Sequence, residues 1–178
     1  GNCHICAIFG VGADKRKEDL GPTRLIVRDC NLDNETRLKM ENKEGEFKQL
    51  ELIYTESKWE NTIDRRTSVA RNPRQTERVP AGALFDFSMI FNVFYDEDIE
   101  RFLTVISIMR MLEEDYIGGS GSRGYGRIRF TDIDIGLKTI DDYESGNDRS
   151  PIDKGLSGLQ LIDSKALGDA LIAKIGAE

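Results

Sequence analysis

The sequence predicts an α+β fold, because two stretches with strand periodicity flank a long stretch with helix periodicity. Apolar residues alternate over residues 84–94, which is typical of a strand with one buried face. Over residues 99–116 they recur at the spacing of an amphipathic helix, with Asp96 or Asp98 as its cap. Glycines end this helix, and residues 127–137 alternate again. Strand, helix, glycine loop and strand in this order make half of a ferredoxin-like βαβ arrangement.

The other segments are expected to be strands, a hairpin or loop, and a short helix. Residues 23–32 and 49–54 are rich in aliphatic and β-branched side chains and are predicted as strands. Residues 57–82 are polar with little apolar periodicity, which indicates a long loop or an extended hairpin. We expect a polar loop at 141–157 and a terminal helix at 164–175, capped by Ser164.

The composition indicates a globular protein from a reducing compartment. Hydrophobic residues make up 39% of the chain and charged residues 32%. The longest apolar-rich stretch, 99–116, contains Arg101, Arg110 and the acids 113–115, so it cannot cross a bilayer. No secretory signal is visible, and three cysteines do not suit a disulfide framework. We therefore expect a cytoplasmic protein that does not contact a membrane.

A glycine-rich loop at 118–130 has the chemistry of an anion-binding segment. Its glycines let the backbone approach a ligand closely, and exposed N–H groups can hold an anion. Arginines add positive charge, and Tyr125 offers a ring face for a base. No P-loop or dinucleotide motif is present, which disfavours ATP or NAD; the alternative is a tight turn with incidental arginines. The candidate contacts are Gly119, Ser122, Arg123, Gly124, Tyr125, Gly126 and Arg127.

A second basic segment lies within residues 57–82 of a chain whose net charge is −7. Arginine, which suits planar contacts to phosphate, is its only basic residue after Lys58. Trp59 either stacks on a base or packs in the core beside Ile63, and the arginines are either phosphate contacts or solvated loop charges. The candidate RNA contacts here are Asn61, Arg65, Arg66, Arg71, Arg74 and Arg78.

The first residues contain a candidate half-site for zinc. Cys3 and Cys6, with His4 between them, have the spacing of tetrahedral zinc ligands. A complete site needs further ligands, and Cys30 is expected instead to be a small buried residue. The acids Asp132 and Asp134 are expected on the solvated face of a strand. With one histidine and no nucleophile-base pair, a hydrolytic triad has no support.

Five segments in order resemble one known family. They are residues 8–10, 24–32, 61–70, 77–85 and 118–130, which include the runs NTIDRRTSVA, ERVP and GGSGSRGYGR. Together they resemble the backbone subunit of type III-A (Csm-type) CRISPR effector complexes, a member of the RAMP superfamily. The resemblance covers most of residues 8–135.

The resemblance implies a single RRM-like RAMP domain over residues 1–178, incomplete at its N-terminus, with 57–82 as a thumb-like hairpin and 1–10 as the zinc half-site. Copies of such subunits stack along a guide CRISPR RNA. The expected partners are that RNA, a target single-stranded RNA, copies of the chain itself and other Csm-complex subunits. By this resemblance Arg65, Arg66, Arg78, Arg123 and Arg127 hold backbone phosphates.

The family cleaves target RNA with magnesium or another divalent ion, using an aspartate in its N-terminal part. That part precedes residues 8–10 and has no counterpart here, so we assign no catalytic residue. We infer that an upstream portion is absent. We therefore expect these 178 residues to bind RNA without cleaving it. The alternatives are another RAMP subunit, either a Cmr-type backbone protein or a pre-CRISPR-RNA processing nuclease, and a zinc-stabilised interaction module.

Overall fold

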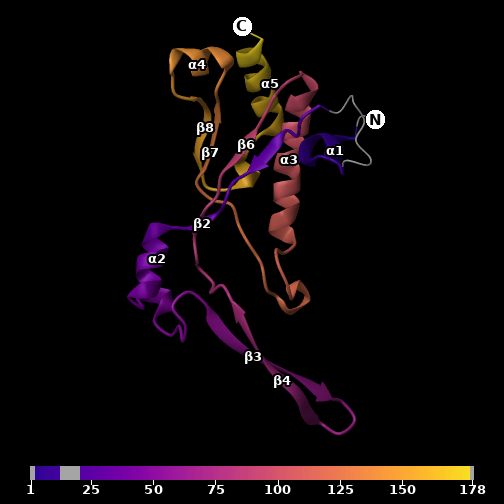
Figure 1. The fold of residues 1–178 in the computed structure, drawn as a ribbon, viewed down its shortest axis with the longest axis vertical. Helices are drawn as coiled ribbons and strands as arrows, with labels where there is room; N and C mark the ends of the chain where they lie inside the picture. The colour runs from indigo at the N-terminus through magenta and orange to yellow at the C-terminus, as the bar shows by residue number, and fades with distance from the viewer. Residues whose placement is uncertain (1–2, 13–20, 177–178) are drawn as a thin grey trace. The chain divides into compact units, whose positions relative to one another are not determined.

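The structure is a computed structural model that describes residues 3–12 and 21–176 (Figure 1). The chain forms two compact units. The first comprises residues 1–26 and 90–178, and the second comprises residues 27–89. Within the described part of the chain, none of the helices combines the length and the apolar composition that a membrane crossing requires.

The first unit is built around the predicted long helix, α3 (Glu97–Glu114). Acidic side chains in its first turn complement the helix dipole. Helix α5 (Ser164–Ile175) packs against α3, and the short helix α1 (His4–Phe9) contributes Ala7 and Ile8 to the buried residues. The buried apolar side chains of this unit, each worth about 1.5–3 kcal/mol, include Ile8, Ile99, Val105, Ile106, Leu159, Ile162, Leu167 and Leu171.

The predicted terminal helix is confirmed, but its cap is not Ser164. The carboxylate of Asp163 accepts hydrogen bonds from the N–H groups of Lys165 and Ala166 and so caps α5. Aspartate and serine are both good caps, so the sequence alone could not separate two adjacent candidates.

The loop predicted for residues 141–157 is wrong. Helix α4 (Ile140–Ser145) begins there, with a reciprocal capping box between Thr139 and Asp142. Strand β8 (Ser150–Leu156) follows and pairs antiparallel with β7 (Ile133–Leu137). The strand predicted for 127–137 is thus regular only from Ile133, where Asp134 lies exposed as expected.

The second unit contains the predicted hairpin and a helix that the periodicity did not indicate. Strands β3 (Glu56–Asp64) and β4 (Val69–Arg78) pair antiparallel, which confirms the hairpin. Helix α2 (Asn34–Glu41) is capped by Asp33, which accepts from the Thr36 N–H. Helix α2 has too few apolar residues to give a clear helical pattern. In the sequence, the capping residue Asp33 was the feature that could have indicated this helix.

Residues 49–54 do not form the predicted strand. Leu50 instead packs with Met40 and Phe47 in the core of the second unit, against Leu32 and Ala83. A 3₁₀ turn at Gly45–Phe47 precedes this segment. Residues 49–54 are thus held by the burial of the Leu50 side chain and not by strand pairing of their backbone.

Two predicted strands are each interrupted. Residues 23–32 divide into β1 (Leu25–Val27) and β2 (Asn31–Leu32), and residues 84–94 divide into β5 (Phe85–Asp86) and β6 (Met89–Phe91). β1 pairs with β6, and β2 with β5. The described strands therefore form four two-stranded sheets, and the mixture of helices and strands confirms the α+β class.

Candidate nucleic-acid interface

One face of the β3–β4 hairpin carries a ladder of ion pairs. Residues that face each other across an antiparallel pair point to the same side. Arg74 Nη2 lies 3.0 Å from Glu60 Oε2, and Arg71 Nη2 lies 3.2 Å from Asp64 Oδ2. Arg78 pairs likewise with Glu56. Three of the five arginines predicted to contact RNA in this segment therefore already face carboxylates.

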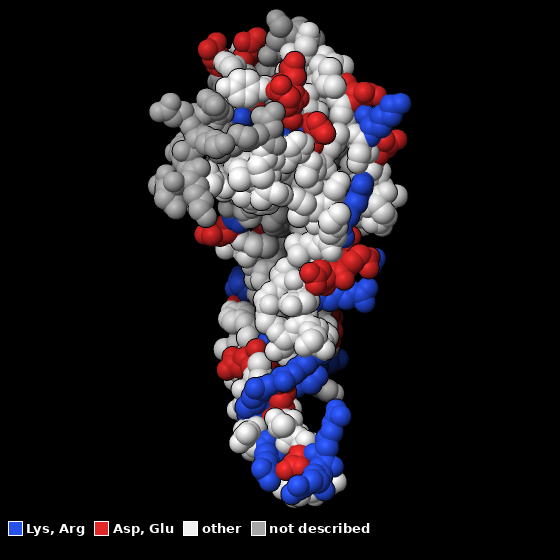
Figure 2. Space-filling view, turned by 90° about the vertical axis from the view of Figure 1, so that its right-hand side faces the viewer, with Lys and Arg blue, Asp and Glu red and all other residues white. Residues whose placement is uncertain are grey.

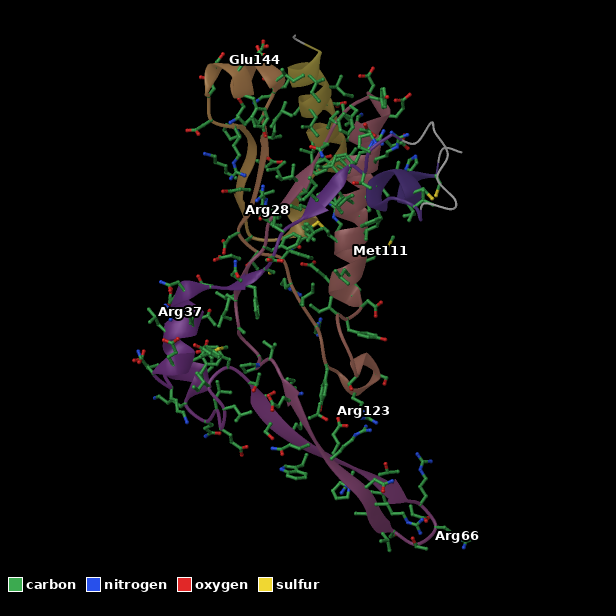
Figure 3. All side chains as sticks on the ribbon, viewed as in Figure 1. Arg28, Arg37, Arg66, Met111, Arg123 and Glu144 are labelled. Carbon is green, nitrogen blue, oxygen red and sulfur yellow. The ribbon has the colours of Figure 1, made fainter. Side chains whose placement is uncertain are left out.

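The turn of the hairpin presents two arginines with a different environment. Asp64 holds the turn, because its carboxylate accepts from the N–H groups of Arg66 and Thr67 and its carbonyl accepts from the Ser68 N–H. The side chains of Arg65 and Arg66 are exposed, and neither has an ion-pair partner among residues 3–12 and 21–176. Figure 2 shows basic side chains gathered over this end of the hairpin, where Figure 3 labels Arg66.

The opposite face of the hairpin carries exposed apolar side chains, with Glu77 opposite Ser57 as a charged residue beside them. Trp59, opposite Gln75, is 68% exposed, and Ile63, opposite Ala70, is 59% exposed. Core packing of Trp59 is therefore not observed, and its ring is accessible. Asn61, also exposed, sits at the register shift between Glu60 and Thr62. The hairpin thus separates a salt-bridged side from a side suited to stacking.

The glycine-rich loop of the first unit is closed against the end of α3. The Ile117 N–H donates to the Gly126 carbonyl over 2.9 Å, and Glu113 Oε1 accepts from the Phe130 N–H over 2.7 Å. Gly126 has a positive φ of 76°, and a Cβ there would lie 2.0 Å from the Ile117 carbonyl oxygen. The close approach that the sequence predicted is thus made to the protein's own backbone.

The side chains of this loop differ in their availability. Ser122, Arg123 and Arg127 are exposed, as are the backbones at Gly119 and Gly124 (Figure 3 labels Arg123). Tyr125, however, is only 9% exposed. Its ring is packed away and does not offer the free face expected from the sequence, because the pattern of glycines gave no information on which way the ring turns.

Sequence reasoning missed a buried ionic cluster that anchors the first unit. The carboxylate of Asp98, which is fully buried, accepts hydrogen bonds from the guanidinium groups of Arg24 and Arg101 and from the N–H groups of Phe94 and Tyr95. Burial acts to raise the pKa of Asp98, but these donors outweigh it, and the pKa lies below its usual value. Arg24, which lies in the family-like segment 24–32, therefore has a structural role.

The zinc half-site remains a prediction. The Cys3 and Cys6 thiols are hydrogen-bonded to each other. The pKa of Cys3 is lowered, first by the Cys6 backbone N–H and then by the Cys6 thiol. The hydrogen bond to Cys3 raises the pKa of Cys6. Among the described residues no group of three or more His, Cys, Asp and Glu side chains could hold a metal. Cys30 is exposed, so the expectation that it is buried is wrong.

Comparison with known proteins identifies the class. Residues 1–129 match the RAMP superfamily, and the chain belongs to it. The fold is accordingly an α+β RAMP fold, and the similarities below confirm the resemblance to Csm-type subunits.

The curated proteins to which this chain is similar include several named Csm3. It is 43% identical over 152 residues to the CRISPR system Cms endoribonuclease Csm3 of Methanocaldococcus jannaschii, an alignment that covers 84% of this chain and 56% of that protein. It is 50% identical over 103 residues to the same-named protein of Enterococcus italicus, covering 57% of this chain and 47% of that one. The chain thus spans about half the length of these curated relatives.

A solved structure shows the same fold. The crystal structure of a Csm3–Csm4 subcomplex in the type III-A CRISPR-Cas interference complex has a TM-score of 0.60 and 30% sequence identity to this chain. The match covers 93% of this chain and 66% of the solved one.

Proposed function

We propose that this chain is the guide-RNA-binding portion of a backbone subunit in a type III-A interference complex, where it holds a CRISPR RNA and positions a target RNA for cleavage. The observation that carries the proposal is the exposed pair Arg65 and Arg66 at the hairpin turn, without ion-pair partners in the described part of the chain. The Csm3 relatives supply the class of complex.

Electrostatics favours the hairpin turn as the phosphate contact. A phosphate gains most from a guanidinium that has no carboxylate beside it, since a paired arginine must first give up its partner. Arg65 and Arg66 meet this condition, whereas Arg71, Arg74 and Arg78 keep facing acids. We therefore rank the two turn residues above the other three, with exposed Arg127 of the glycine loop as a further contact.

The face of the hairpin that carries Trp59 suits the bases. Stacking on an aromatic ring is worth about 1–3 kcal/mol per base and tolerates any sequence. Exposed Trp59 offers such a ring beside exposed Asn61. A hairpin with phosphate-binding arginines at its turn and a stacking ring on one face fits the thumb-like role that the family resemblance implies.

The other partners follow from the relatives. The similar solved structure pairs Csm3 with Csm4, so we propose that this chain assembles with copies of itself and with a Csm4-like subunit. We further propose that Cys3, Cys6 and His4 contribute to a structural zinc site, because the two thiols already lie together. Loss of bound zinc, measured by elemental mass spectrometry, is expected in a Cys3→Ser/Cys6→Ser variant.

The double variant Arg65→Ala/Arg66→Ala tests RNA binding. Anisotropy of a labelled single-stranded RNA, measured over a range of salt concentrations, should show weaker binding and a slope of log K against log salt that is shallower by about 0.7 per lost contact. Arg37→Ala is the matched control, since Arg37 is exposed in the same unit but bonded to Glu41 and Asn34. An unchanged affinity and slope in the double variant would overturn the proposal.

A further inference from the structure

The segment that leaves the glycine loop is held at two points by the end of α3. The Gly126 carbonyl accepts from the Ile117 N–H over 2.9 Å, and the Phe130 N–H donates to Glu113 Oε1 over 2.7 Å. Glu113 lies in the last turn of α3, and Figure 1 shows the loop just beyond that end of the helix. Residues 126–130 are therefore fixed at both ends, at one of them by a side chain.

Between these two bonds, exposed and half-buried side chains alternate. Arg127 and Arg129 are exposed, whereas Ile128 and Phe130 are half-buried. Such alternation is typical of an extended chain, in which residues two apart point to the same side and lie about 6–7 Å apart. The two guanidinium groups therefore extend from one side of a segment whose ends are fixed. Arg129 is not among the residues that the sequence predicted as RNA contacts.

Neither the helix nor the binding of a polyanion favours an acid at position 113. A carboxylate in the last turn of a helix opposes the helix dipole, and α3 has no basic residue in that turn. A negative charge close to Arg129 also repels a phosphate. What the Glu113 side chain gains is the bond from the Phe130 N–H, which is strong because its acceptor is charged. The acid at this position is thus best explained by the segment that it holds.

We infer that Glu113 is a positioning residue for RNA binding, which holds residues 127–130 so that Arg127 and Arg129 contact neighbouring phosphates of one RNA strand. Glu113 acts through the backbone of Phe130 and does not touch the RNA. A segment held in its binding conformation gains affinity because it loses less conformational freedom when the ligand binds. This inference rests on the proposed RNA binding, and adds to it one phosphate contact and the residue that orients it.

The variant Glu113→Ala tests this role, because positioning and simple charge predict opposite signs. Loss of a negative charge should tighten the binding of a polyanion, whereas release of the two arginines should weaken it. We expect the affinity for a labelled single-stranded RNA to fall about threefold or more, with a slope of log K against log salt that is shallower by up to about 0.7 per released contact. Glu114→Ala removes the same charge from the next, exposed residue of α3 and should not weaken binding.

Two conservative variants separate the hydrogen bond from the charge. Glu113→Gln keeps an acceptor oxygen at the same reach without the charge, and should bind RNA at least as tightly as the wild type. Glu113→Asp keeps the charge but withdraws the carboxylate by one methylene group, and should weaken binding. Wild-type affinity in Glu113→Asp, or weaker binding by Glu113→Gln than by Glu113→Asp, overturns the inference. This pair decides the question also if circular dichroism shows that Glu113→Ala does not fold.

A double-mutant cycle separates positioning from a general loss of stability. Arg129→Ala alone should weaken RNA binding, and unchanged affinity would remove it as a contact. In Arg127→Ala/Arg129→Ala, the further change Glu113→Ala should cost no more affinity, because the residues through which it acts are gone. An equal loss in both backgrounds overturns the positioning role. RNA binding that Arg65→Ala/Arg66→Ala weakens but Glu113→Ala does not overturns this inference alone, whereas a wild-type chain that binds no single-stranded RNA overturns the proposed function as well.

Discussion

At the residue scale, one carboxylate organises the entry into α3. Asp98 accepts four hydrogen bonds from Arg24, Arg101, Phe94 and Tyr95. The Arg24 guanidinium also lies 5.4 Å from the centre of the Phe94 ring, at cation–π distance. A buried charge pair contributes little against an apolar alternative, but removing one member leaves the other charge uncompensated.

The variant Asp98→Asn should therefore lose about 3–5 kcal/mol of the free energy of unfolding. Urea denaturation near neutral pH measures this loss, and exposed Asp169→Asn on α5 is the control, with an expected change below about 0.5 kcal/mol. A loss below about 1 kcal/mol for Asp98→Asn would contradict the anchoring role.

The difference in unfolding free energy between the wild type and Asp98→Asn should depend on pH. Because the folded pKa of Asp98 is lowered, its stabilisation is fully present above the unfolded value of about 4 and is lost as the pH falls through the lower folded value. The stability difference between the wild type and Asp98→Asn should thus shrink in acid, and a difference that grows instead would reverse the sign of the shift.

At the element scale, the glycine loop depends on backbone geometry at one position more than at its neighbours. Gly126→Ala would combine a positive φ with a collision against the Ile117 carbonyl, whereas a Cβ at Gly119 meets nothing within 4 Å. The first substitution should cost about 2 kcal/mol or more of unfolding free energy, and Gly119→Ala less than about 1 kcal/mol. Thermal denaturation distinguishes them, and equal stability of the two variants would show that the loop is not closed in this way.

The ion-pair face of the hairpin gives a second prediction at this scale. Glu60→Gln frees the Arg74 guanidinium, so RNA affinity should rise about twofold or more at low salt, at a stability cost of about 0.2–1 kcal/mol. Glu51→Gln removes the same charge in the same unit away from the hairpin. A rise that is identical in both variants would reflect net charge alone and not the release of Arg74.

Elements with strong periodicity or with clear turn and cap residues at their ends were predictable from the sequence. Elements that depend on long-range contacts were not. Helix α3 and the hairpin were predicted because their patterns are local. Residues 49–54 failed because Leu50 is drawn into a cluster with distant residues. In the candidate site, Arg65 and Arg66 were named as RNA contacts from the sequence, and that role stays a prediction. The pairing of Arg74 with Glu60 and the burial of Tyr125 depend on register and packing that no local pattern encodes.

At the scale of the whole molecule, the chain is acidic, and ion pairs hold several of its basic side chains. The net charge is −7, and many basic side chains are held by acids, including Arg24, Arg37, Lys39 and Arg101. Exposed Arg65 and Arg66, which have no ion-pair partner in the described part of the chain, and exposed Arg127 of the glycine loop are where a polyanion meets least repulsion. Acids elsewhere disfavour non-specific adhesion of RNA.

Ultraviolet cross-linking of thiouridine-containing RNA to the wild-type chain, with mass-spectrometric mapping of the linked peptides, is the most direct test of this arrangement. The proposed function predicts cross-links within residues 59–66 of the hairpin and 122–127 of the glycine loop. Cross-links that fall only on other segments, such as α4 and β8, with the hairpin unlabelled, would contradict it.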